Sequence, residues 1–167
     1  MLAGMTDPNL LLVACRSVIF GAALLLWGAS AYRWRLQPAA RAMGFEGLAV
    51  LALVAAIVVL LPVQVARIAG GWDDFGDFEL VRDVLLYTTP GKAWLFQAAA
   101  IAATAVAVAT GATRIAVAGT TLIFIAQTLT GHAAASDGLE GLLRQGTHVL
   151  HMIAAGAWLG ALPYVLR

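Results

Sequence analysis

Long apolar segments, almost free of charged residues, run through this 167-residue chain. A helix needs about 20 apolar residues to cross the ~30 Å hydrocarbon core of a bilayer. Hydrophobic residues make up 62% of the chain and charged residues 11%, whereas soluble domains have about 45–50% and about 25%. The sequence therefore predicts an all-α, polytopic membrane helix bundle, a single domain over residues 1–167, with about five transmembrane helices at residues 9–32, 45–69, 92–110, 114–131 and 147–166.

The charge and the motif content exclude several classes of function. The formal net charge is +1, which provides no strongly basic field, so we expect no nucleic-acid partner. Cys15 is the single cysteine and lies in an apolar run, which favours a packing role. The chain has no Ser-His-Asp pattern, no HExxH and no phosphate-binding glycine loop. We expect a non-enzymatic protein whose immediate surroundings are membrane lipid.

Two connections indicate how the predicted helices begin and turn. The sequence "TDPN" precedes the first span, where Thr6 or Asp7 can cap the helix and Pro8 suits its first turn. The third and fourth spans are joined only by "TGATR". So short a link predicts a tight antiparallel hairpin.

Arginines give the predicted orientation, because cytoplasmic loops are enriched in Lys and Arg. They follow the first span, separate the third and fourth spans, and end the chain: Arg33, Arg35, Arg41, Arg114 and Arg167. The connection between the second and third spans is rich in Asp and Glu instead. We therefore predict an N-terminus outside and a C-terminus inside.

The outer connection between the second and third spans contains "FELVRDVLL". Phe78, Val81 and Leu85 recur at helical spacing, which predicts a short amphipathic helix at the membrane interface. Two interpretations are open at this point: an ordinary connecting helix, or a surface on which a partner docks.

All three histidines lie in one short window near the C-terminus. His132 closes the fourth predicted span, whereas His148 and His151 lie one turn apart on the fifth. Because these two spans are consecutive and antiparallel, the three imidazoles are expected to meet near one point on the outer side. Imidazole is the commonest protein metal ligand and suits copper, zinc, iron and nickel. The sequence leaves open whether they form a metal or cofactor site or are separate interfacial histidines.

Further residues belong to this predicted outer site. Arg144 and Trp158 share the helix face of the two histidines, and an inward-pointing Arg144 would repel a bound cation. Asp137 and Glu140 have capping spacing, which predicts that this helix begins near residue 138. Met152 points elsewhere on the helix and is expected to pack.

Polar residues inside the spans are the remaining candidates for a supporting role. Arg16 lies two turns into the first span and needs a polar partner, for which Asp137 or Asp83 would serve. Gln127 lies near the end of the fourth span, five residues before His132. A polar path along the spans and simple bonding to the helix backbone are both open interpretations.

Three stretches resemble one known family. In chain order they are "LLYTTPGKAWLFQ", "TGHAAA" and "HMIAAGAWLGAL". They are similar to the membrane part of the copper resistance D proteins, CopD/PcoD. In this likeness His132 and His151 match the two motif histidines, and Trp158 and Gly160 match a W-x-G element. His148 departs from the pattern. Family members usually have about eight spans, so the chain resembles a short member or a part of a longer one.

The resemblance implies a bacterial inner-membrane protein that moves copper between periplasm and cytoplasm, often with a small periplasmic copper-binding protein, CopC, as partner. The residues also allow a b-type haem protein in which two of the histidines are axial ligands. A third alternative is an assembly subunit that binds neither. The sequence does not fix the oxidation state of the copper, the direction of transport or the oligomeric state.

Overall fold

The computed structural model describes residues 7–72, 76–130 and 138–166, and within them every regular element is a helix. This confirms the predicted all-α class. In chain order the helices are α1 (Pro8–Arg35), α2 (Gly44–Ala69), α3 (Phe78–Tyr87), α4 (Thr89–Thr110), α5 (Thr113–Thr128) and α6 (Gly138–Val165).

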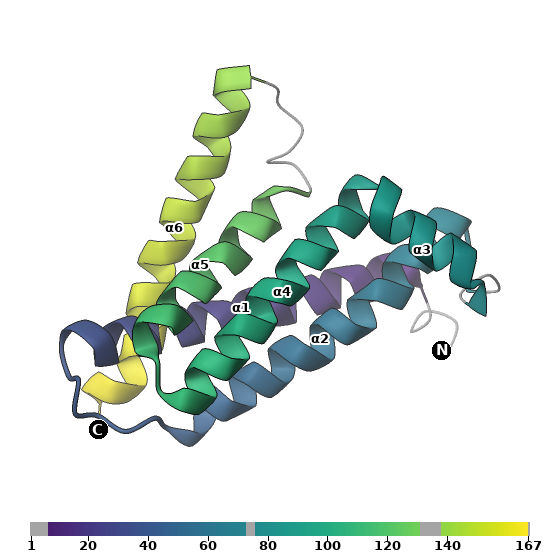
Figure 1. The fold of residues 1–167 in the computed structure, drawn as a ribbon. Coiled ribbons are helices and arrows are strands. Elements are labelled where there is room, and N and C mark those ends of the chain that lie inside the picture. The colour runs from purple at the N-terminus through teal and green to yellow at the C-terminus, as the bar shows by residue number, and fades with distance from the viewer. Residues whose placement is uncertain (1–6, 73–75, 131–137, 167) are drawn as a thin grey trace.

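Four helices, α1, α2, α4 and α5, run side by side as an antiparallel bundle, and α1 contacts α2, α5 and α6 (Figure 1). The short α3 lies at one end. The hydrophobic core is formed by fully buried apolar residues of several helices, among them Ile19, Leu26, Leu53, Ile123 and Phe124. The buried Met152 of α6 completes this core, as predicted.

Four of the described helices, α1, α2, α4 and α6, are long and apolar enough to cross a bilayer. The fourth predicted span corresponds to α5, which has 16 helical residues. At ~1.5 Å per residue it is about 24 Å long, shorter than the ~30 Å hydrocarbon core. The chain is therefore a polytopic helix bundle, and the count of five spans stays a prediction.

The helix ends follow the local signals of the sequence. Asp7 caps α1 by accepting a hydrogen bond from the Asn9 backbone N–H at 2.9 Å, and Pro8 occupies the first turn. Gly111 ends α4 in the left-handed conformation, with φ of 73°, and only two residues separate α4 from α5. The predicted tight hairpin is thus confirmed.

A sharp corner joins α3 to α4 and explains the sequence "TTPGK". Thr88 is both the C-cap of α3 and the N-cap of α4. Its hydroxyl donates a hydrogen bond to the Val84 carbonyl at 2.6 Å and accepts one from the Gly91 N–H at 3.0 Å. A Cβ at Gly91 would overlap that same carbonyl, so only glycine lets the two helices approach this closely.

The helix predicted from "FELVRDVLL" is present as α3. Val84 is the buried residue, because it faces the corner with α4, whereas Phe78 is 77% exposed. Val81 and Leu85 are half-buried beside it. Packing on α4 therefore buries Val84 and leaves Phe78 exposed.

Contact between α1 and α6 is closest where both helices carry glycine. A Cβ at Gly28 would overlap the carbonyl oxygen of Gly156, and one at Gly160 would overlap the carbonyl oxygen of Leu25. Small residues let helix backbones approach in this way. Beyond this crossing the N-terminal half of α6 leaves the bundle and projects from it (Figure 1).

Two ends of the molecule can now be defined. The arginine end carries the α1–α2 connection, the α4–α5 turn and the C-terminal turn of α6, and includes Arg33, Arg35, Arg41 and Arg114. The histidine end is the opposite one, toward which the projecting half of α6 with His148 and His151 extends.

Candidate functional site

His148 and His151 lie on the projecting half of α6, and both are exposed. Within a helix, residues three apart are neighbours separated by about 4.5 Å along the axis. Both imidazoles line one open groove of about 530 Å³ on the flank of α6, together with Arg144 and Thr147. The pair is thus held on a rigid helix and is accessible from outside the bundle.

His148 also lines a second, neighbouring pocket of about 360 Å³ where α1, α5 and α6 meet. Arg16 of α1 and Gln127 of α5 line the same pocket. The structure therefore brings together three of the residues that the sequence singled out. The nitrogen of the Gln127 side-chain amide is buried without a hydrogen-bond partner.

Arg16 of α1 forms a hydrogen bond with a neutral side chain. Its guanidinium donates a hydrogen bond to the Thr130 hydroxyl at 2.8 Å, which ties α1 to the end of α5. The alternative carboxylate partner Asp83 makes no such contact, because α3 packs on α4 and not on α1. The charge of Arg16 therefore lies beside His148 without a described counter-ion.

Arg144, which the sequence placed on the face of the two histidines, does lie in their groove. It pairs with Glu140 one turn earlier, at 2.7 Å, and both side chains are largely exposed. An exposed ion pair is weak but offsets most of the local positive charge. A cation in the groove would therefore meet less electrostatic repulsion than an unpaired Arg144 would cause.

Two predicted residues, His132 and Asp137, lie outside the described residues, so the convergence of three imidazoles stays a prediction. Across the described ranges no three His, Cys, Asp or Glu side chains are grouped to hold a metal ion. Trp158 is 76% exposed and lies two turns beyond His151, about 10 Å along α6. A supporting role of Trp158 stays a prediction.

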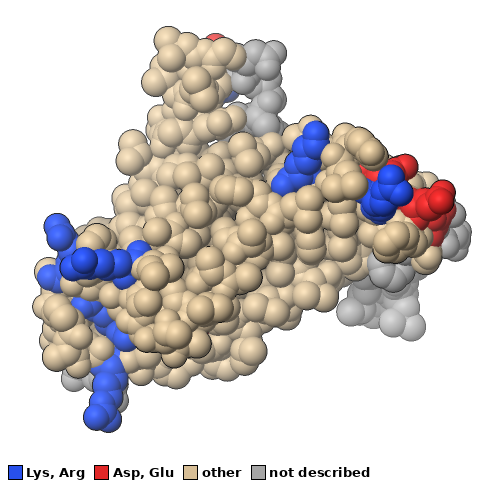
Figure 2. Space-filling model, in the orientation of Figure 1, with Lys and Arg blue, Asp and Glu red and all other residues tan. Residues whose placement is uncertain are grey.

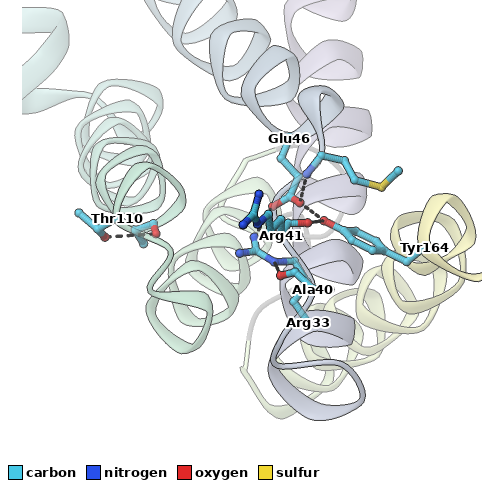
Figure 3. A network of polar contacts seen from close by, with 8 residues as sticks. Arg33, Ala40, Arg41, Glu46, Thr110 and Tyr164 are labelled. Carbon is cyan, nitrogen blue, oxygen red and sulfur yellow. Dashed lines mark hydrogen bonds and ion pairs between the residues drawn. The ribbon is translucent and has the colours of Figure 1, made fainter. Parts of the chain in front are cut away.

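Sequence reasoning missed a buried polar network at the arginine end (Figure 3). Glu46 of α2 is 1% exposed and pairs with Arg33 of α1 at 2.9 Å. Its other oxygen accepts hydrogen bonds from the Met43 N–H, at 3.1 Å, and from the Tyr164 hydroxyl of α6. Three helices are thus tied together. Glu46, a carboxylate at the start of an apolar span, was the available signal.

The fold and the site define a class: a polytopic helical membrane protein with accessible imidazoles at one end. The family model for the copper resistance protein D-like N-terminal domain matches residues 5–142, and the chain belongs to this family. This confirms the resemblance seen in the sequence.

One similar curated protein is the inner membrane protein YebZ of Escherichia coli. The two are 27% identical over 164 residues, which is 92% of this chain and 56% of YebZ. The chain thus spans about half the length of this relative. No solved structure matches this chain.

Proposed function

We propose that the chain is a copper-handling protein of the bacterial inner membrane. It captures copper at the histidine end, on the periplasmic side, through His148 and His151 of α6 and through His132. It acts as a carrier of the ion and not as an enzyme. The ion is its cargo and passes from this end toward the other side of the membrane.

One observation carries the proposal: two imidazoles lie one turn apart in a single accessible groove, in a chain of the copper resistance D family. Two nitrogen donors at this spacing can bind one ion, and imidazole suits copper in particular. A third ligand would complete the site. His132 is the remaining imidazole of the chain and lies eight residues before Glu140, the first residue that lines the groove.

The surroundings of the two histidines favour transient binding. Both side chains are exposed, and the groove is open along the flank of α6. A cargo site must release its ion, whereas a resident metal is normally enclosed and held by further hydrogen bonds to its ligands. The described contacts give neither His148 nor His151 such a partner.

The test is copper binding by the purified chain, measured by metal analysis and by calorimetric titration. We expect H148A/H151A to lose the site and H132A to weaken it. Thr147→Ala is the matched control, since Thr147 lines the same groove but its hydroxyl bonds only the Leu143 carbonyl. Unchanged copper binding in H148A/H151A would refute the assignment.

A visible spectrum of the same sample tests the other two functions. A Soret band that H148A or H132A abolishes would establish the b-type haem protein in place of copper handling. If neither copper nor haem binds, the assembly-subunit alternative holds. Docking of a CopC-like copper donor at the histidine end is part of the proposal, and copper-dependent co-purification with such a protein would test it.

A further inference from the structure

A groove at the arginine end has no part in the proposed copper site. It runs between α1 and the C-terminal half of α6 and has a volume of about 270 Å³. Small residues form its floor, namely Gly28 and Ala31 of α1 and Ala157 and Ala161 of α6, and the larger side chains of Trp27, Tyr32 and Leu36 border it. The groove lies beside the glycine crossing of α1 and α6, where glycine and alanine carry little side chain to fill the space. Its lining is almost wholly apolar.

Arg35 closes the groove at the end of α1. Its guanidinium carbon lies 5.1 Å from the centre of the Trp34 ring. The guanidinium carbon of Arg114, from the start of α5, lies 5.7 Å from the same centre. Both distances are within the range of a cation–π interaction. One aromatic ring therefore lies near guanidinium groups from two different helices, and one of these, that of Arg35, lines the apolar groove.

No carboxylate among the described residues neutralises these two arginines. The described acidic residue at this end is Glu46, which is buried and already paired with Arg33. Figure 2 shows the same imbalance, since the Lys and Arg at the arginine end are visible without any Asp or Glu beside them. Both Arg35 and Arg114 are exposed. Their mutual repulsion would be relieved by an anion.

We propose that this groove and its two arginines form a binding site for an anionic phospholipid. The phosphate of the headgroup lies against Arg35 and Arg114, and one acyl chain lies in the groove between α1 and α6. Basic residues beside apolar helix surfaces bind such headgroups, those of cardiolipin included. A helix of a second copy fits less well, because it would cover Arg35 without neutralising it.

Position along α1 supports the proposal. Arg35 lies in the last turn of a helix of 28 residues, and Trp34 precedes it. Trp and Arg are typical of the level at which the headgroups of a bilayer begin. The charged end of the groove is therefore at the depth of the phosphate, and its apolar part extends from there toward the acyl chains.

The test is native mass spectrometry of the full chain taken from vesicles of phosphatidylcholine mixed with cardiolipin or with phosphatidylglycerol. We expect wild type to retain the anionic lipids selectively, and R35Q/R114Q to retain them about fivefold less for each arginine removed. Ala157→Leu fills the groove and should lower retention while both arginines remain. R82Q/K92Q removes two exposed charges on α3 and α4 and should leave retention unchanged.

Three results would overturn the proposal: equal retention of phosphatidylcholine by wild type, unchanged retention of anionic lipid in R35Q/R114Q, or an equal loss in R82Q/K92Q. A dimer that forms without lipid and that Ala157→Leu dissociates would assign the groove to a second copy. Copper binding is measured at the opposite end, so failure here leaves the proposed function untouched.

Discussion

Tyr164, in the last turn of α6, donates a hydrogen bond to the carboxylate of Glu46, near the start of α2. The same carboxylate pairs with Arg33 near the end of α1, so one buried acid ties the C-terminal helix α6 to the first two helices of the chain. The Tyr164 ring also stacks on Tyr32, with 5.5 Å between ring centres. The arginine end of α6 is thereby fixed, whereas its histidine end projects freely.

Glu46→Ala should strongly destabilise the protein. It leaves the buried guanidinium of Arg33 without a counter-ion, which typically costs about 3–5 kcal/mol. Tyr164→Phe keeps the ion pair and removes one hydrogen bond to a charged group, so we expect a loss of about 1.5–3 kcal/mol. Thermal unfolding in detergent measures both. Tyr87→Phe, at a residue 70% exposed, is the control. Equal effects of the two Phe variants would show that the hydrogen bond from Tyr164 contributes nothing to stability.

Gly28→Ala should separate α6 from α1. The new methyl group would overlap the Gly156 carbonyl oxygen, and backbone cannot move aside as the end of a flexible side chain can. Gly21→Ala is the matched control on the same helix, since its Cβ meets nothing within 4 Å. In that control, replacing glycine within a helix should stabilise by about 0.5–1 kcal/mol. Thermal unfolding that moves in the same direction for both variants would contradict the close crossing.

Gly91→Ala should loosen α3 without unfolding the bundle, because the added methyl group meets the Val84 carbonyl at the α3–α4 corner. Hydrogen exchange should speed up in the amides of α3 and remain slow in those of α2. Gly47→Ala, at a site with open space around it, should leave both rates unchanged. Slow exchange of α3 in the Gly91 variant would disprove this role of the corner.

Charge changes in the histidine groove should shift copper affinity in opposite directions. Arg144→Gln removes a positive charge beside His148 and His151 and should tighten binding a few-fold, whereas Glu140→Gln should weaken it by a similar factor. Exposed pairs of this kind contribute about 0.2–1 kcal/mol, which sets the modest size. Calorimetric titration at low salt measures it. Shifts of the same sign would place the ion outside this groove.

The predicted orientation can be tested with single cysteines in a Cys15→Ala background. We expect Gln37→Cys, in the α1–α2 connection, to be shielded from a membrane-impermeant maleimide in intact spheroplasts. Glu79→Cys, on α3, should be labelled. The reason is the arginine content of the first connection and the acidic content of the second. The reverse labelling pattern would place the N-terminus in the cytoplasm.

Much of the architecture followed from local signals. Apolar runs predicted the long helices, Asp7 and Pro8 predicted the start of α1, and the start of α6 at Gly138 agrees with the prediction near residue 138. Such signals act between residues that are close along the chain, so the sequence contains them directly. The likeness to the copper resistance D family rested on short sequence motifs, and the match of the family model to residues 5–142 confirmed it.

Tertiary structure decided what depends on helices packing at a distance. The charge of Arg33 was assigned to a loop, yet that residue is buried because Glu46 faces it across α1 and α2. Val84 is the buried residue of α3 because this helix packs on α4, which the spacing of its apolar residues did not reveal. His148 meets Arg16 and Gln127 because the glycine crossing sets where α6 lies. Apolar periodicity shows that a helix buries a face; which helix covers it depends on shape and on the pairing of charges across the bundle.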